Sequence, residues 1–172
     1  MLAINKLIDC FNDCFKNEFN VILVGGAEEP LYTPIENNDV PAKIYFRLDY
    51  VSSALHEISH WCIAGHDRLK MEDYGYWYET DSRTLEMQKK FESVEVKPQA
   101  VEMAFHKVLG LPFRVSADNM SLIDYDTSHF EEAVQQQFYQ YLEIGFPVRA
   151  QAFCEYLLKY QEINKSLYEY LK

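Results

Sequence analysis

The order of apolar and polar residues along the chain predicts one amphipathic helix followed by two strands. Residues 2–17 place apolar side chains at helical spacing, with polar residues between them. The apolar positions of this helix are Leu2, Leu7, Ile8, Phe11 and Phe15. The runs NVILVGG, residues 20–26, and KIYFRLDY, residues 43–50, are rich in β-branched or alternating side chains, which predicts two strands. The stretch between them, residues 27–41, contains three prolines and is predicted to be a surface loop.

The rest of the chain is predicted to be mostly helical. A second helix is expected to begin behind Asp49 as its N-cap and to continue to Gly65, because apolar residues again recur at helical spacing. An aromatic loop follows at residues 71–83. Further helices are predicted at residues 84–91, 98–110, 128–145 and 147–164. Pro98 is placed at the start of its own helix because proline suits the first helical turn, and Ser128 is the expected cap of the next.

Length and composition predict a single domain, residues 1–172. The chain is 48% hydrophobic and 25% charged, so it can bury a core without disulfides, and its four cysteines show neither a CxxC pair nor a disulfide-framework spacing. The net charge is −11 without a run of lysines or arginines, which argues against nucleic acid as a direct partner. No stretch is long enough to span a bilayer, and the start of the chain lacks the pattern of a secretion signal. We therefore expect a cytoplasmic protein with no membrane partner.

The sequence HEISH, residues 56–60, carries the clearest chemical signal. On a helix, His56 and His60 are about one turn apart and project from the same face, so both rings can face one point, with Glu57 beside it. This is the HExxH arrangement, in which two neutral imidazoles hold a divalent ion and the glutamate reaches its bound water. We expect an α+β fold, mostly helical with a small β-sheet and a zincin-like metal-binding helix, and Glu57 as the catalytic residue.

A third ligand is required, and three residues compete for the role. His66 stands at the offset of the third histidine in metzincins, but isoleucine occupies the position where those proteins need glycine. Glu95 and Glu102 fall on one face of a later helix, as in gluzincins, and Glu95 has Gln99 four residues later, which could orient the site. We rank Glu95 first, Glu102 second and His66 third. The competing interpretation of Glu102 and of His106 is an exposed helix face.

Several longer strings resemble one family of enzymes. LHEISHWCIAG, residues 55–65, EDYGYWYETDSRTLEMQKKFESVEVKPQA, residues 72–100, and the helix after them are similar to the bacterial elongation factor P hydroxylases. The resemblance covers residues 40–115. It implies a cytoplasmic enzyme that hydroxylates the β-lysylated lysine side chain of elongation factor P, a post-translational modification that supports translation.

The resemblance also implies a metal centre. Carried over by motif, the ligands are His56, His60 and a carboxylate of the VEVKPQA segment, which in the ranking above is Glu95. Two histidines and one carboxylate are what an oxygen-activating Fe(II) site uses, so Fe(II) and molecular oxygen are the expected cofactor and cosubstrate. Metal identity stays open, since these ligands favour zinc over iron by affinity. The alternative function is a zinc metallopeptidase of HExxH type, in which Glu57 acts as a base toward water. A non-catalytic module stabilised by its metal is a third possibility.

The substrate side chain implied by the resemblance bears ammonium groups on a long apolar stem, which suits a pocket of carboxylates and aromatic faces. The EDYGYWY string supplies both, unless it packs as an aromatic lid on the core. The substrate-binding candidates are Asp73, Tyr76, Trp77 and Tyr78. Arg83 and Lys97 are candidates for binding an organic-acid cosubstrate, or are surface charges. The sequence contains no flavin or nicotinamide fingerprint, so it does not identify the electron source.

Overall fold

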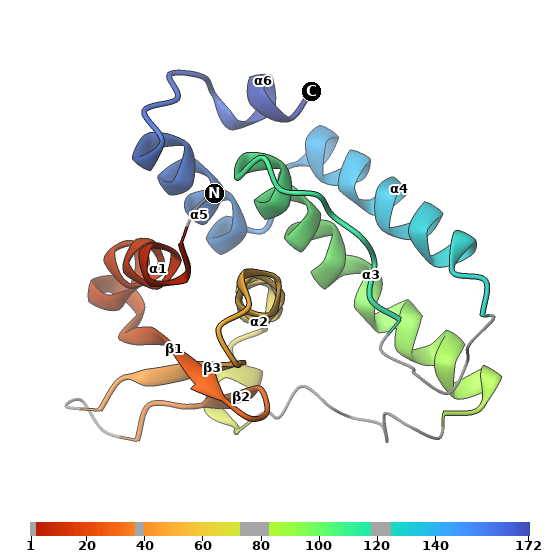
Figure 1. Cartoon of the computed structure of the whole chain (residues 1–172), viewed down its shortest axis with the longest axis horizontal. Helices are drawn as coiled ribbons and strands as arrows, with labels where there is room; N and C mark the ends of the chain where they lie inside the picture. Colours follow the sequence, from red (N-terminus) through yellow and green to blue (C-terminus); the bar gives the residue numbers. More distant parts are fainter. Residues whose placement is uncertain (1–2, 37–39, 73–82, 118–124) are drawn as a thin grey trace.

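The computed structural model describes residues 3–36, 40–72, 83–117 and 125–172. Within these ranges the chain has the expected α+β character, with helices forming most of the molecule and a three-stranded sheet at one end (Figure 1). Most of the predicted aromatic loop, residues 73–82, lies outside the described residues. Of the helices in the described ranges, none combines the length and the apolar character needed to cross a membrane.

The sheet is arranged around a central strand, β3. Its strands are β1 (Val21–Ala27), β2 (Leu31–Thr33) and β3 (Ala42–Arg47), in the order β1-β3-β2. β1 pairs with β3 in parallel and β2 pairs with it antiparallel. Both predicted strands are confirmed, but the prediction of a loop over residues 27–41 is wrong where β2 forms. Pro30 and Pro34 flank β2 and are tolerated because it is a short edge strand.

Three helices meet in an aromatic cluster beside the sheet. They are α1 (Ile4–Phe19), α2 (Val51–Ile63) and α5 (Val148–Tyr160). The ring of Trp61 on α2 lies 5.5 Å from that of Phe11 and 4.8 Å from that of Phe15, between centroids. Phe153 of α5 lies 5.8 Å from Phe11. All four rings are buried, and burial of a side chain such as phenylalanine stabilises the fold by roughly 1.5–3 kcal/mol. This cluster holds α2 firmly by one of its faces.

The start of α2 differs from the prediction. The N-cap is Tyr50, with no side-chain hydrogen bond to the first turn, so Asp49 is not the cap. The Asp49 side chain lies instead against β1, where a Cβ on Gly25 would be 3.0 Å from its Oδ1. Contact with the neighbouring strand has therefore taken the side chain away from the helix end.

The end of α2 is capped by an arginine from another helix. α2 stops at Ile63, two residues earlier than predicted. Arg149 of α5 donates from Nε to the carbonyl of Cys62 at 3.2 Å and from Nη2 to the carbonyl of Ala64. Its guanidinium carbon lies 4.6 Å from the centre of the Trp61 ring. Because the last carbonyls of a helix lack partners within it, this arginine satisfies α2 and ties it to α5.

α3 (Leu85–Val108) is one helix of 24 residues, where the sequence predicted two. Pro98 lies buried inside it, although proline removes a helical hydrogen bond and costs about 3 kcal/mol in a helix interior. α3 packs against α2 and α4 (Ser128–Ile144) and buries apolar residues before and after the proline, such as Phe91 and Phe105, which offsets that cost. Val94, whose carbonyl loses its partner, is 56% exposed, so water can replace the missing bond.

The predicted C-terminal helices are confirmed as α4 and α5, with different ends. Ser128 is the first residue of α4 and Thr127 is its N-cap, so Ser128 is not the cap. α5 ends at Tyr160, four residues earlier than predicted. The remaining elements, which the sequence did not predict, are α6 (Leu167–Leu171) and the 3₁₀ helix η1 (Arg68–Lys70).

Replacing Arg149 by Met is expected to lower the free energy of unfolding by about 1–2 kcal/mol, because two carbonyls at the end of α2 lose their donors. Urea denaturation followed by tryptophan fluorescence measures the change. Lys159→Met removes an exposed cation from the same helix and should change the value by less than about 0.5 kcal/mol. Equal effects of the two substitutions would show that the cap does not stabilise the fold.

Candidate functional site

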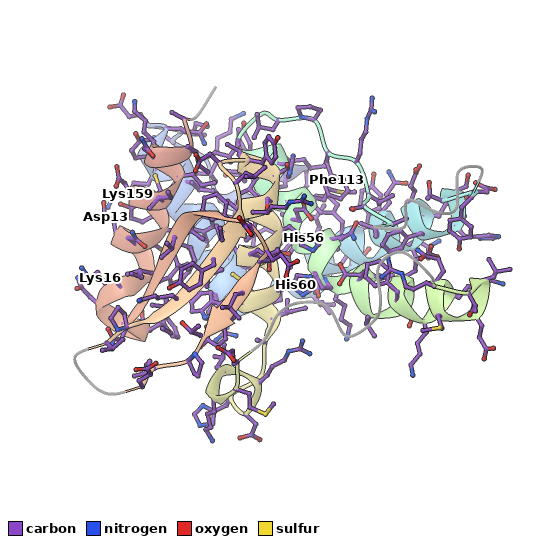
Figure 2. The ribbon with its side chains drawn as sticks, turned by 60° about the horizontal axis from the view of Figure 1, so that its bottom comes forward. Asp13, Lys16, His56, His60, Phe113 and Lys159 are labelled. Carbon is purple, nitrogen blue, oxygen red and sulfur yellow. The ribbon has the colours of Figure 1, made fainter. Side chains whose placement is uncertain are left out.

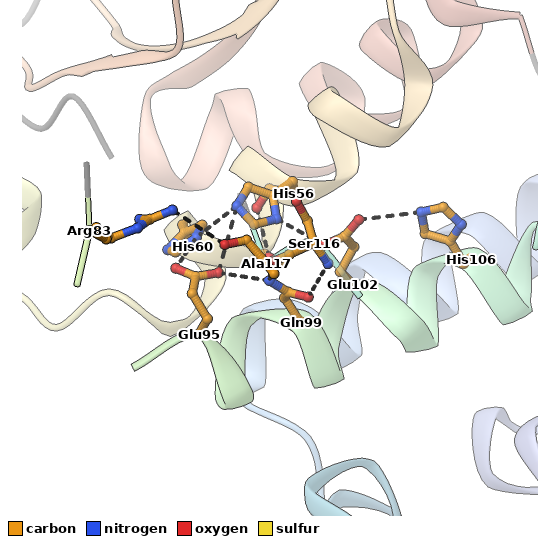
Figure 3. A network of polar contacts seen from close by, with 10 residues as sticks. His56, His60, Arg83, Glu95, Gln99, Glu102, His106, Ser116 and Ala117 are labelled. Atoms are coloured by element: carbon orange, nitrogen blue, oxygen red, sulfur yellow. Dashed lines mark hydrogen bonds and ion pairs between the residues drawn. The ribbon is translucent and has the colours of Figure 1, made fainter. Parts of the chain in front are cut away.

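Two histidines and one glutamate converge between α2 and α3. His56 and His60 lie on the side of α2 that faces away from α1 (Figure 2). Glu95 projects from α3 toward them (Figure 3). The Nε2 atoms of the two histidines are 3.1 Å apart. Glu95 places Oε1 3.2 Å from Nε2 of His60 and Oε2 3.8 Å from Nε2 of His56. Three donor groups thus surround one small volume.

The spacing of these groups fits the ligands of a single ion. One donor atom from each of His56, His60 and Glu95 lies within 4.8 Å of the others, and ligand atoms about 2.1 Å from one metal lie roughly 3–4 Å apart. Imidazole nitrogen together with carboxylate oxygen suits first-row divalent metals such as iron and zinc. Among the described histidines, cysteines and acidic residues, these three form the group that has this spacing. They could therefore hold a divalent metal ion.

The other candidate residues have different surroundings. His66 is exposed and does not join the group of donors. Glu102 contacts His56 on the opposite nitrogen, with Oε2 2.9 Å from Nδ1. Lys97 is exposed, whereas Arg83 is buried and donates to a backbone carbonyl at 3.2 Å, so it is not a surface charge. The four proposed substrate-binding residues of the EDYGYWY string lie outside the described residues.

The charges around the histidines favour a cation at this place. Burial lowers the pKa of His56, but the carboxylates of Glu102 and Glu95 outweigh burial and raise the pKa to about 10. Burial raises the pKa of Glu95, but His60 and His56 outweigh it and lower the pKa to about 2. Burial raises the pKa of Glu57. A metal ion bound through Nε2 of His56 would compete with a proton for that nitrogen.

A stripe of buried polar residues, which was not predicted from the sequence, runs along α3. Its members recur at alternating spacings of four and three residues and are between 0 and 8% exposed. This polar stripe consists of Gln88, Glu92, Glu95, Gln99, Glu102 and His106. The interpretation of Glu102 and His106 as an exposed face is wrong, because both are buried. The signal that could have found the stripe is its spacing, which is typical of a buried helix seam and is here occupied by polar side chains.

The segment 111–117 covers the polar stripe. It leaves the end of α3 and runs back along the helix (Figure 1). Near the end of α3, Nδ1 of His106 lies 2.7 Å from the carbonyl of Pro112. Further back, Gln88 donates to the carbonyl of Ala117 at 2.9 Å. Backbone groups of the segment therefore serve as partners for side chains that burial separates from bulk water.

Gln99 connects this segment to the candidate site. Its Nε2 donates to the carbonyl of Ser116 at 2.8 Å, and its Oε1 accepts from the N–H of Ser116 at 2.9 Å. The same Nε2 lies 3.2 Å from Oε2 of Glu95 and donates to it. One amide thus fixes the path of the segment and the orientation of the carboxylate together (Figure 3).

Two cavities meet at the site. Their volumes are about 540 Å³ and 550 Å³, and Glu57, His60, Phe91 and Glu95 line both. The first cavity is lined further by Tyr32, Ile44, Trp61, Ile63, Leu69 and Val94, together with Arg68. The second cavity is lined further by Arg47, Tyr50, Ser52, Ser53 and Arg114. His60 is therefore reached from both cavities, and His56 from the second.

Replacing Gln99 by Leu is expected to lower the free energy of unfolding by about 1–2 kcal/mol, because the backbone groups of Ser116 lose their partners. Urea denaturation measures the change. Gln136→Leu, at an exposed position of α4, is the matched control and should stay within about 0.5 kcal/mol of the unchanged protein. A loss no greater than that of the control would show that Gln99 does not hold the segment.

Comparison with known proteins gives a consistent result. The family model described as elongation factor P hydroxylase matches residues 10–170. The chain is also 48% identical over 149 residues to the elongation factor P lysine hydroxylase of Haemophilus influenzae, an alignment that covers 86% of this chain and 83% of that protein. These matches confirm the resemblance drawn from the sequence strings. The chain therefore belongs to the elongation factor P hydroxylase family.

Proposed function

We propose that this protein hydroxylates a lysine side chain of elongation factor P, the one that carries a β-lysyl group. Membership of the family supports hydroxylation of elongation factor P, and the name of the H. influenzae relative specifies lysine. The observation that carries the proposal is the convergence of His56, His60 and Glu95 where the two cavities meet. A metal ion held there would be open to a substrate and to a small second reactant from the two cavities.

The donor groups suit Fe(II). His56 and His60 would hold the ion through Nε2 and Glu95 would hold it through its carboxylate, which leaves further positions free for reactants. Bound there, Fe(II) would supply the activation of dioxygen that insertion of an oxygen atom into a C–H bond requires. The protein contributes the orientation of these groups, since Gln99 holds the Glu95 carboxylate by a hydrogen bond.

The first cavity suits the substrate side chain. A β-lysylated lysine has a long aliphatic stem with nitrogen groups along and at the end of it, which favours apolar walls with a carboxylate nearby. Ile44, Trp61 and Leu69 would contact the stem. Glu57, which lines both cavities, would accept a hydrogen bond from a nitrogen of the side chain and so position it.

A zinc metallopeptidase is the alternative function. The observation that favours it is the place of Glu57 beside the two histidines, because a carboxylate there can act as a general base toward water. Family membership favours the hydroxylase. The two functions differ in their need for oxygen and in their products.

His56→Ala and His60→Ala are expected to abolish stoichiometric binding of Fe(II) or Zn(II). Loss of a residue that only orients a ligand lowers metal affinity roughly 10- to 100-fold, and Glu95→Ala should lower it by more than that. Metal content and dissociation constants measure the effect, and circular dichroism checks that each variant is folded. His66→Ala is the control and should bind as the unchanged protein does. Stoichiometric metal in either histidine variant would rule out the proposed ligands.

The second experiment tests the reaction. Incubation of the Fe(II)-loaded protein with β-lysylated elongation factor P, a reductant and oxygen is expected to add about 16 Da to the substrate, because hydroxylation inserts one oxygen atom. With ¹⁸O₂ the added mass should be about 18 Da, and without oxygen it should be absent. Intact-mass spectrometry measures both. Cleavage of the substrate chain without oxygen, and no label in the product, would support the peptidase instead.

A further inference from the structure

Glu102 lies directly behind one of the proposed ligands. Its Oε2 is 2.9 Å from Nδ1 of His56, while Nε2 of the same ring faces His60 and Glu95. A carboxylate only accepts hydrogen bonds, so the Nδ1 atom of His56 carries the proton that it donates to Glu102. In a neutral imidazole only one nitrogen is protonated, and Nε2 is then left with a lone pair directed toward the other donors.

Without such a contact the orientation of this ring would be undetermined. The second side-chain torsion of histidine has a broad and roughly two-fold preference, so a half-turn that exchanges the positions of the ring nitrogens costs little by itself. The i, i+4 spacing of His56 and His60 determines which face of α2 they share, but it does not determine which nitrogen each ring presents. For His56 the contact with Glu102 makes that choice.

Glu102 is itself held in place from behind. It is 7% exposed, and its Oε1 lies 3.5 Å from Nε2 of His106, an ion-pair distance (Figure 3). His106 is 6% exposed, and its Nδ1 lies 2.7 Å from the carbonyl of Pro112, which can only accept. The contacts therefore form a continuous series from the backbone of segment 111–117 through His106 and Glu102 to His56.

From this series we infer that Glu102, supported by His106, is a positioning residue for His56 and not a metal ligand. On the far side of the His56 ring, Oε2 of Glu102 is engaged by Nδ1 of that ring, and Oε1 faces Nε2 of His106 at an ion-pair distance, without a hydrogen bond. The negative charge of Glu102 also makes the His56 ring a stronger donor through its free nitrogen, as carboxylates behind ligating histidines do. This inference rests on the proposed metal site and assigns a role to two residues of α3 that do not belong to the donor group.

Two substitutions at Glu102 separate positioning from ligation. Glu102→Gln keeps an oxygen that can accept from Nδ1 of His56, whereas Glu102→Leu removes it. A positioning role predicts a loss of Zn(II) affinity of only a few-fold for Gln and of about 10- to 100-fold for Leu. Glu92→Leu removes another buried carboxylate of the polar stripe and is the matched control, with unchanged affinity expected. Similarly large losses of affinity in Glu102→Gln and Glu102→Leu would overturn the inference. Equal losses in Glu102→Leu and Glu92→Leu would overturn it as well.

A spectroscopic measurement tests the same inference without the reaction. In the Zn(II)-loaded protein, ¹H–¹⁵N NMR of the histidine rings should show a slowly exchanging proton on Nδ1 of His56 and zinc on Nε2. Glu102→Gln should keep that proton, and Glu102→Leu should expose it to exchange. If Leu at position 102 prevents folding, His106→Phe combined with Glu102→Gln replaces it. Because His106 is inferred to act through Glu102, the double variant should lose less binding free energy for Zn(II) than the sum of the losses in the two single variants. A loss equal to that sum would overturn the inference.

The controls distinguish this inference from the proposed metal site. If the unchanged protein and His60→Ala bind Zn(II) equally, the proposed site itself is wrong. If His60→Ala loses the metal while Glu102→Leu, folded by circular dichroism, binds as the unchanged protein does, the site stands and only the role of Glu102 is refuted.

Discussion

The site and the path of the chain around it depend on one constraint, which is that the buried polar side chains of α3 need hydrogen-bond partners. Six polar side chains occupy a seam that would ordinarily be apolar. A buried polar group without a partner costs on the order of 1–3 kcal/mol, so the polar stripe is tolerable only if partners are built in. Segment 111–117 supplies backbone partners at Pro112, Ser116 and Ala117. The segment and the stripe therefore require one another.

α2 links this polar arrangement to the apolar core. One face of the helix packs Trp61 into the aromatic cluster with α1 and α5, and its end is capped by Arg149. The other face presents His56 and His60 to α3. Because both faces are engaged, the histidines are carried by an element that cannot rotate without loss of core packing. Rigid support of this kind is what holds donor groups within the small tolerance that a metal requires.

The electrostatic character of the site agrees with family membership. Glu57, Glu95 and Glu102 surround two histidines in a partly buried region, and they raise the pKa of His56 to about 10. An environment of this kind favours positive charge, whether from a proton, a divalent ion or the nitrogen of a lysine-like side chain. The first cavity beside it, with Ile44, Trp61 and Leu69 in its walls, suits the long stem of such a side chain. Hydroxylation of a lysine derivative needs both properties at one place.

The sequence by itself determined those features that depend on neighbours along the chain. The helical spacing of His56 and His60, the two main strands and the amphipathic first helix follow from local periodicity, and longer strings identified the family. Glu95 was one of three candidates to join the histidines, and Gln99 was singled out as its orienting neighbour. These inferences needed no knowledge of what packs where.

Only the tertiary structure decided which groups are covered and by what. Asp49 is a good helix cap by type but contacts β1, and Pro98 is a helix breaker by type but lies within α3, because contacts with other elements outweigh local preference. Glu102 and His106 are polar and were expected on an exposed face, yet segment 111–117 returns along α3 and buries them. Glu102 was also ranked as a possible ligand, because the sequence does not show that it would contact Nδ1 of His56. Burial and side-chain partners are set by residues distant in sequence, and for that reason the local pattern could not specify them.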